Sequence, residues 1–228
     1  MKIAGIDPSI NSTGKVIMDL DDDLNIKNIE FYGYTTGITK GFEKNNVHIY
    51  PLCRNYEKMQ ILERQDVAYN ILNKDMEDVK FISFEEYAFS KGSSGRVFQI
   101  GEFCGGLKRF FYDQGKGIVV YGINQIKRFA TGNGNADKIM MCQSFKEEWE
   151  SIYPELFDNW TTYNFKQYES PHSDLCDAFW MCEILRNHIK YDILGESSLD
   201  SNKIKLLTCS TTKKSKALIS HDVIIKKV

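Results

Sequence analysis

Three short apolar runs open the chain, and polar turns separate them. Residues 2–6 lead to Asp7, residues 14–20 resume the pattern after a polar turn, and residues 28–34 are again rich in β-forming side chains. Short strands joined by tight turns pair most simply as an antiparallel meander. The segment 35–55 has no clean period, and we interpret it as an inserted loop or hairpin.

Helical and strand patterns alternate in the rest of the chain. Between residues 56 and 76, apolar side chains recur about every 3.6 residues, which indicates a crossover helix before a strand at 79–84. The later elements are a second helix, a strand and two further helices, at residues 97–111, 118–123, 136–149 and 172–188. This order predicts an α/β fold: a mixed sheet of three antiparallel strands plus parallel strands, with helices on both faces.

Composition and charge narrow the class of protein. The 228 residues are 42% hydrophobic and 26% charged with a net charge of −2, which excludes disordered and low-complexity chains. The six cysteines form no C-x-x-C pair, so we expect reduced thiols. The N-terminus has no apolar signal segment and no run of about 18 apolar residues occurs, so we expect a soluble cytoplasmic protein without a membrane partner.

Four carboxylates stand at the ends of predicted elements. Asp7 and Glu85 end two strands, while Asp174 and Asp177 are three positions apart at the start of the last core helix, hence on one helical face. Ligand sites of open α/β sheets form at such strand ends. Singly, each acid also fits a turn, a solvated strand end or a helix-dipole partner. Together they predict a site for Mg²⁺ or Mn²⁺, in which two ions about 3.5–4 Å apart act on a phosphodiester.

Four blocks in order resemble the motifs of the RuvC-type Holliday-junction resolvases, which belong to the RNase H-like nuclease superfamily. They are IAGIDPSINSTG at 3–14, FEEY at 84–87 with the helix after it, NQIKR and GNGNADK within 124–138, and HSDLCDA at 172–178. The resemblance covers residues 1–34, 56–150 and 172–190. It implies an RNase H-like nuclease domain at 1–190, with insertions at about 35–55 and 151–171, and leaves a basic C-terminal appendage at 191–228.

The resemblance also implies the roles of individual residues. Asp7, Glu85, Asp174 and Asp177 become ligands of two Mg²⁺ or Mn²⁺ ions and, with Lys138, the catalytic residues. Glu86 becomes a neighbour of the site, although the doublet leaves open which glutamate turns inward. The family's stacking aromatic falls on Ala88, so its flanking aromatics are the candidates instead. The residues expected to contact DNA are Lys127, Arg128, Lys138, Tyr87, Phe89, Lys91 and Arg96. His172 is expected at a solvent position at its helix start.

The implied function is a metal-dependent, structure-selective endonuclease of DNA recombination and repair. It cleaves four-way or other branched DNA and leaves 5′-phosphate and 3′-hydroxyl ends. Two symmetric cuts imply a homodimer, formed through the glycine- and aromatic-rich helix at 98–111. The inserted segments suggest a viral or phage member, which would act in the host cytoplasm.

Other functions remain open from the residues alone. An RNase H-like nuclease acting on RNA or simple flaps, or an inactive DNA-binding relative, would have the same fold. An actin-like nucleotide-binding protein is disfavoured, because the sequence shows one strand with a following Asp and no second glycine-rich phosphate loop.

Overall fold

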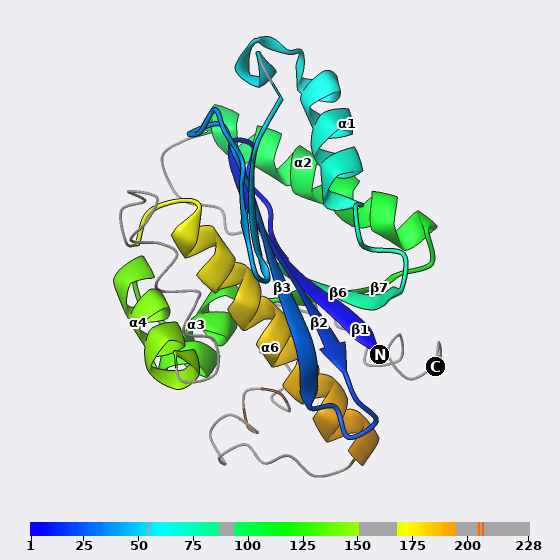
Figure 1. Cartoon of the computed structure of the whole chain (residues 1–228), viewed down its shortest axis with the longest axis vertical. Helices are drawn as coiled ribbons and strands as arrows, with labels where there is room; N and C mark the ends of the chain where they lie inside the picture. Colours follow the sequence, from blue (N-terminus) through cyan, green and yellow to red (C-terminus); the bar gives the residue numbers. More distant parts are fainter. Residues whose placement is uncertain (54, 87–93, 151–167, 195–204, 206, 208–228) are drawn as a thin grey trace.

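One seven-stranded sheet runs through the molecule, in the order β4-β5-β3-β2-β1-β6-β7 (Figure 1). The computed structural model describes residues 1–53, 55–86, 94–150, 168–194, 205 and 207, with only the backbone at 94–97 and 194. The strands are β1 (Lys2–Asp7), β2 (Ser12–Leu20), β3 (Ile26–Thr35), β4 (Phe42–Lys44), β5 (Val47–Pro51), β6 (Val79–Glu85) and β7 (Gly117–Tyr121).

The pairing confirms the predicted mixed sheet. Strands β1, β2 and β3 form the antiparallel meander, and β6 joins β1 in parallel with β7 beyond it. The segment 35–55 forms the antiparallel β4–β5 hairpin, whose second strand pairs in parallel with β3. The meander and the hairpin therefore make one continuous sheet, with β1 between an antiparallel and a parallel neighbour.

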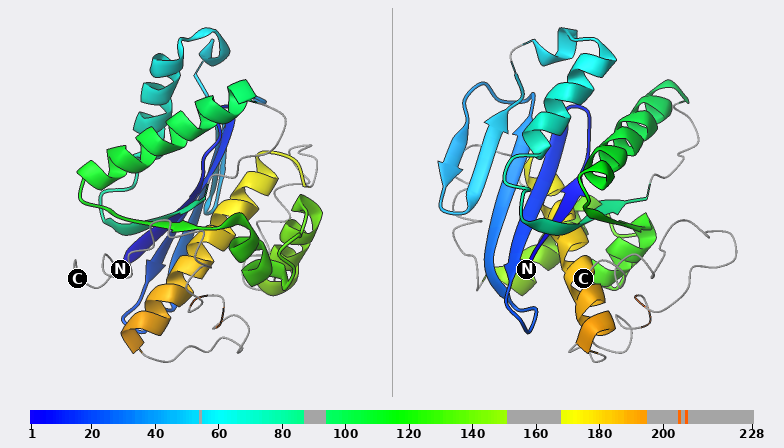
Figure 2. Two further views of the ribbon diagram at one scale, coloured as in Figure 1. Left: turned by 180° about the vertical axis from the view of Figure 1, so that it is seen from behind. Right: turned by 90° about the vertical axis from the view of Figure 1, so that its right-hand side faces the viewer.

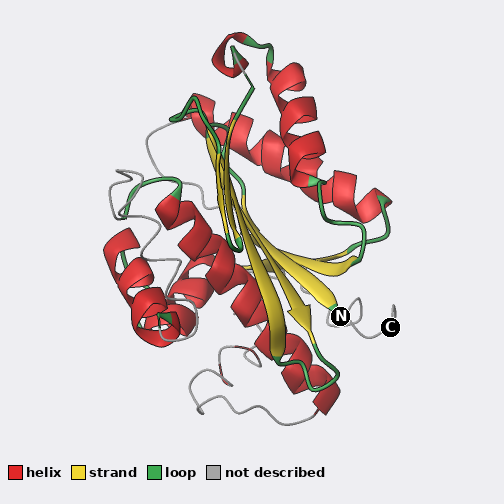
Figure 3. Cartoon of the chain, in the orientation of Figure 1, coloured by secondary structure: helices red, strands yellow, loops and turns green. Residues whose placement is uncertain are grey.

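Helices cover both faces of the sheet, as predicted. They are η1 (Tyr56–Lys58), α1 (Ile61–Leu72), α2 (Ser94–Asp113), α3 (Ile123–Thr131), α4 (Lys138–Trp149) and α6 (His172–Leu194). Helices α1 and α2 lie on one face, whereas α3, α4 and α6 lie on the other (Figures 2 and 3). Alternate residues of β1 serve the two layers: Ile3 packs in the core under α6, and Ala4 and Ile6 pack in the core under α1 and α2.

Several elements differ from their predicted bounds. The crossover helix begins at Ile61, because the backbone at Met59 and Gln60 is extended and separates the helix from the short 3₁₀ turn before it. The sequence predicted no helix for the basic block at 124–131, but these residues belong to α3, with Ile126 and Phe129 buried on one face. Helix α6 continues to Leu194, past the domain boundary placed at 190. Most of the insertion 151–171 and of the appendage 191–228 lies outside the described residues.

Candidate active site

Parallel pairing of β1 and β6 brings two of the predicted acids side by side. Ile6 pairs with Phe84, so Asp7 and Glu85 follow at neighbouring strand ends. Each lies two positions beyond a residue that contacts α6, since Ser83 Oγ donates to the Met181 carbonyl at 2.8 Å and Gly5 faces the backbone of α6. Because strand side chains alternate, Asp7 and Glu85 point to the α6 side of the sheet.

Two glycines bring the start of α6 directly onto the sheet. A Cβ atom on Gly14 would meet the backbone of Asp174, and one on Gly5 would meet the backbone of Ala178 and Cys182. Gly14 is also the antiparallel partner of Asp7. The absence of side chains at these two strand positions therefore places the first turns of α6, with their acid pair, beside the carboxyl end of β1.

An open pocket of about 300 Å³ lies at this junction. Its lining combines three of the predicted metal ligands with two lysines and the cap residue of α4: Asp7, Glu85, Asp177, Lys127, Lys138, Asp137, Ile123, Ile126 and Met141. Asp137 holds the start of α4 by accepting a hydrogen bond from the Met140 amide at 2.9 Å. The pocket therefore has acidic residues from the strands and α6 facing basic residues from α3 and α4.

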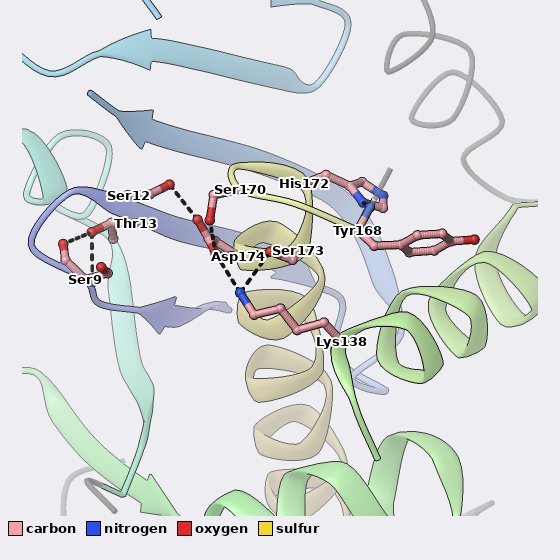
Figure 4. A network of polar contacts seen from close by, with 9 residues as sticks. All are labelled: Ser9, Ser12, Thr13, Lys138, Tyr168, Ser170, His172, Ser173 and Asp174. Carbon is pink, nitrogen blue, oxygen red and sulfur yellow. Dashed lines mark hydrogen bonds and ion pairs between the residues drawn. The ribbon is translucent and has the colours of Figure 1, made fainter. Parts of the chain in front are cut away.

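Asp174 differs from Asp177 in its surroundings, because hydrogen bonds already surround its carboxylate (Figure 4). The side chain is buried, with 4% of the residue's surface exposed. Its oxygens accept hydrogen bonds from three serine hydroxyls and lie 3.7 Å from the Lys138 ammonium. The serines are Ser12 at 2.5 Å, Ser170 at 2.9 Å and Ser173 at 3.3 Å. These donors fix the orientation of Asp174 beside the pocket.

The side chain of Thr13 holds the turn between β1 and β2. Thr13 Oγ1 donates to the Ser9 carbonyl at 2.8 Å and accepts from the Ser9 amide at 3.2 Å. Figure 4 shows this pair beside Ser12, which reaches Asp174 from the same turn. The turn that follows Asp7 thus supports the acid pair of α6 as well as ending the first strand.

The pKa values of the carboxylates at the site are raised, because they are buried and lie close to one another. Burial and the charges of Asp177, Asp174 and Glu85 raise the pKa of Asp7 well above its ordinary value. Burial likewise raises the pKa of Asp177 to about 7, although the Lys138 ammonium opposes this shift. Burial raises the pKa of Glu85 against the lysines at positions 127, 138 and 108. Carboxylate oxygens gathered in this way fit a hard divalent cation such as Mg²⁺ or Mn²⁺.

The other predicted site residues fall in different places. The Arg128 side chain is exposed beside Gly134 and does not line the pocket. Glu86 lies near Gly122, so Glu85 is the glutamate of the doublet that lines the pocket. Three residues expected to contact DNA lie outside the described residues, and the side chain of a fourth does: Tyr87, Phe89 and Lys91, and Arg96.

Sequence reasoning was wrong about His172 and missed the serines. His172 is buried rather than solvent-exposed, because the first turn of α6 packs against α4 and the Tyr168 amide donates to its Nδ1 atom at 3.2 Å (Figure 4). Ser12 lies 162 positions from Asp174, so no local pattern indicates its role. Ser170 is only four positions from Asp174, but nothing in the sequence analysis singled it out. Of the helices that the structure describes, none has the length and hydropathy needed to cross a bilayer.

Comparisons with known proteins support this architecture. No family model matches the sequence, and no curated protein matches it either. Among solved structures, RuvC of Thermus thermophilus aligns with a TM-score of 0.51 at 18% identity, over 86% of this chain and 98% of that one. A fowlpox virus resolvase bound to Holliday junction DNA aligns with a TM-score of 0.46 at 16% identity, over 82% and 97% of the two chains. The likeness to the Thermus protein shows that this chain has the RuvC-type, RNase H-like fold.

Proposed function

We propose that this protein is a metal-dependent, structure-selective endonuclease that cleaves four-way or other branched DNA. The main support is that Asp7, Glu85 and Asp177 line one pocket together with Lys127 and Lys138. It lies at the carboxyl ends of β1 and β6, where open α/β sheets bind ligands. The RuvC-type fold and the four sequence blocks support branched DNA as the substrate.

The acidic residues would hold two Mg²⁺ or Mn²⁺ ions. Asp7, Glu85 and Asp177 offer oxygens to the pocket, and Asp174 reaches the same cluster from the adjoining turn of α6. When bound, such ions activate a water nucleophile and stabilise charge on the attacked phosphate and the leaving 3′-oxygen. Cleavage would accordingly leave 5′-phosphate and 3′-hydroxyl ends.

The chain's basic residues would position the DNA strand. Lys138 donates to Ser173 Oγ at 3.1 Å and pairs with Asp174, which keeps its ammonium at the pocket although the side chain is 59% exposed. Lys127 lines the pocket from α3. Two lysines beside three carboxylates offer contacts to phosphates on either side of a scissile bond.

Cutting a junction symmetrically requires two such pockets, and α2 offers a surface for a two-fold dimer. Phe98 and Tyr112 are exposed large side chains on α2. Between them, a Cβ built on Gly101 or Gly105 would have no described atom within 4 Å apart from its chain neighbours and the nearby backbone of α2 itself. These four positions follow one helical face, so a second copy of α2 could pack closely against it.

Cleavage of a substrate panel tests the proposal. Four-way, three-way, flap and linear DNAs, and an RNA/DNA hybrid, are incubated in Mg²⁺ or in Mn²⁺ with the wild type, Asp7→Asn or Asp66→Asn. Asp66 is an exposed carboxylate on α1 and serves as the matched control. We expect branched DNA to be cut by the wild type and the control, whereas Asp7→Asn binds junctions but cuts orders of magnitude more slowly.

Three outcomes would contradict the proposal. Preferential cleavage of the hybrid or of simple flaps would identify a different RNase H-like nuclease. Junction binding by the wild type without cleavage in either metal would indicate an inactive relative. Cleavage that persists in Asp7→Asn would mean that the pocket is not the site of cleavage.

A further inference from the structure

A second group of metal-ligating side chains lies between α4 and the first turns of α6. Cys142 comes from α4, while His172 and Cys176 stand four positions apart on one face of α6. All three are about 1% exposed, and none lines the acidic pocket. Both thiols are free.

The three side chains converge at the spacing of a metal site. One ligand atom from each lies within 4.8 Å of the other two. The Cys176 Sγ and His172 Nε2 atoms are 3.7 Å apart. A tetrahedral zinc ion, with bonds of about 2.3 Å to sulfur and 2.0–2.1 Å to nitrogen, would separate such a pair by about 3.6 Å. The observed separation of this pair therefore already matches that of two zinc ligands.

We propose that Cys142, His172 and Cys176 bind one Zn²⁺ ion. Thiolate and imidazole donors favour zinc, whereas the carboxylates of the neighbouring pocket favour Mg²⁺ or Mn²⁺. Three protein ligands leave the fourth tetrahedral position to a water molecule. This inference is independent of the proposed nuclease function, since it concerns different donors in a different place.

Binding has a defined proton balance. The Tyr168 amide donates to Nδ1 of His172, so the ring proton sits on Nε2, facing Cys176. Coordination through Nε2 moves that proton to Nδ1, and the two thiols release their protons to solvent. The Tyr168 amide must then give up its bond to the ring. Zinc binding is therefore linked to the segment that carries Ser170, a hydrogen-bond donor to Asp174.

The ion would join the two helices that carry the candidate catalytic groups. Helix α4 begins with Lys138, and the first turns of α6 carry Asp174 and Asp177. A bond from Cys142 through the metal to Cys176 would fix these helices at their contact. Because the three ligands are buried and do not line the acidic pocket, zinc would stabilise the arrangement of the site without entering it.

Cobalt spectroscopy and metal content test the site in the full chain. Excess Mg²⁺ is kept present to compete at the acidic pocket, and Co²⁺ or Zn²⁺ is then added at one equivalent. In the wild type we expect intense thiolate-to-cobalt charge transfer, one retained Zn²⁺ per chain and a rise of several degrees in Tm. Cys142→Ser and Cys176→Ser should lose all three signals. Cys182→Ser, a buried cysteine of the same helix outside the group, should keep them.

Several results would overturn the assignment. Absence of thiolate-to-cobalt charge transfer in the wild type would overturn it, whether or not the serine variants fold. Circular dichroism shows whether those variants fold. Zinc retained equally by the wild type and folded serine variants would place the ion elsewhere. Loss of zinc in an Asp7→Asn, Asp177→Asn double variant that keeps both cysteines would place it at the acidic pocket.

Discussion

The surroundings of Asp177 disfavour its charged form. Burial raises its pKa from 3.8 to about 7, so between these values the folded protein binds a proton that the unfolded chain lacks. The free energy of unfolding of the metal-free protein should accordingly fall as pH rises through that window. Asp177→Asn should flatten this fall, leave stability at pH 7 equal or higher, and reduce the stabilisation by Mg²⁺. Urea unfolding from pH 4 to 8, with and without Mg²⁺, measures both effects.

The opposite result would indicate that Asp177 only supports the start of α6. If the carboxylate only supports the helix start, Asp177→Asn should cost about 0.3–1 kcal/mol of metal-free stability and leave cleavage almost unchanged.

Lys15 is a buried cation on β2 with a different pH signature. Its ammonium donates to the carbonyls of Leu72 and Lys74, at 3.4 and 2.6 Å, and lies 4.2 Å from the ring centre of Tyr32. Burial lowers its pKa from 10.5 to about 7, so above pH 7 the unfolded chain binds a proton that the folded protein has lost. Stability should therefore rise with pH from 7 to 9. Lys15→Met should reduce this slope, whereas exposed Lys44→Met should keep it, as measured by chemical unfolding.

Lys127 should act on DNA through charge alone. Neutralising one phosphate releases about 0.9 counterion on duplex DNA, so Lys127→Ala should reduce the slope of log affinity against log salt by about that amount. Binding is measured in Ca²⁺ or without metal, so that no cleavage intervenes. Lys27→Ala, an exposed lysine near the start of β3, is the control. An unchanged slope for Lys127→Ala would make this lysine an ordinary surface charge.

At the scale of elements, the approach of α6 to the sheet depends on Gly14. An added methyl group would press on the Asp174 backbone, so Gly14→Ala should cost about 1–3 kcal/mol of stability and weaken the response to Mg²⁺. Gly37→Ala adds the same group in ordinary van der Waals contact with Thr35, and we expect it to be nearly neutral. Denaturant unfolding with and without Mg²⁺ compares the two. Equal stabilities of the two variants would mean that α6 can shift away from the sheet without a cost in stability.

The sequence could predict those features whose signals lie in neighbouring residues. Asp7 and Glu85 could be placed because a strand's apolar period and its end are visible in neighbouring residues. The β4–β5 hairpin had no clean period, and the amphipathic face of α3 is short and was hidden by its basic residues. The contrast between Asp174 and Asp177 was not predictable, since Ser12 lies 162 positions away in the chain.

At the scale of the whole molecule, the exposed face of α2 predicts the oligomeric state. We expect light scattering to give twice the chain mass of 26.3 kDa. Phe98 is 70% exposed, and Phe98→Glu should produce monomers that no longer cut both strands in concert. Leu62 on α1 is 68% exposed, and Leu62→Glu should stay dimeric. A wild-type monomer at micromolar concentration with full junction cleavage would contradict this prediction.

The contacts along α6 also determine where the chain tolerates a change of length. A slip of one residue would rotate the helix by about 100° and carry Asp177 away from Asp7. That register is fixed inside the helix, where Met181 meets Ser83 and Ala178 meets Gly5. Residues added or removed ahead of Tyr168 therefore leave the acid pair in place. Natural variation in length should concentrate in that segment, while an insertion between Asp177 and Met181 would separate the acids from their anchor.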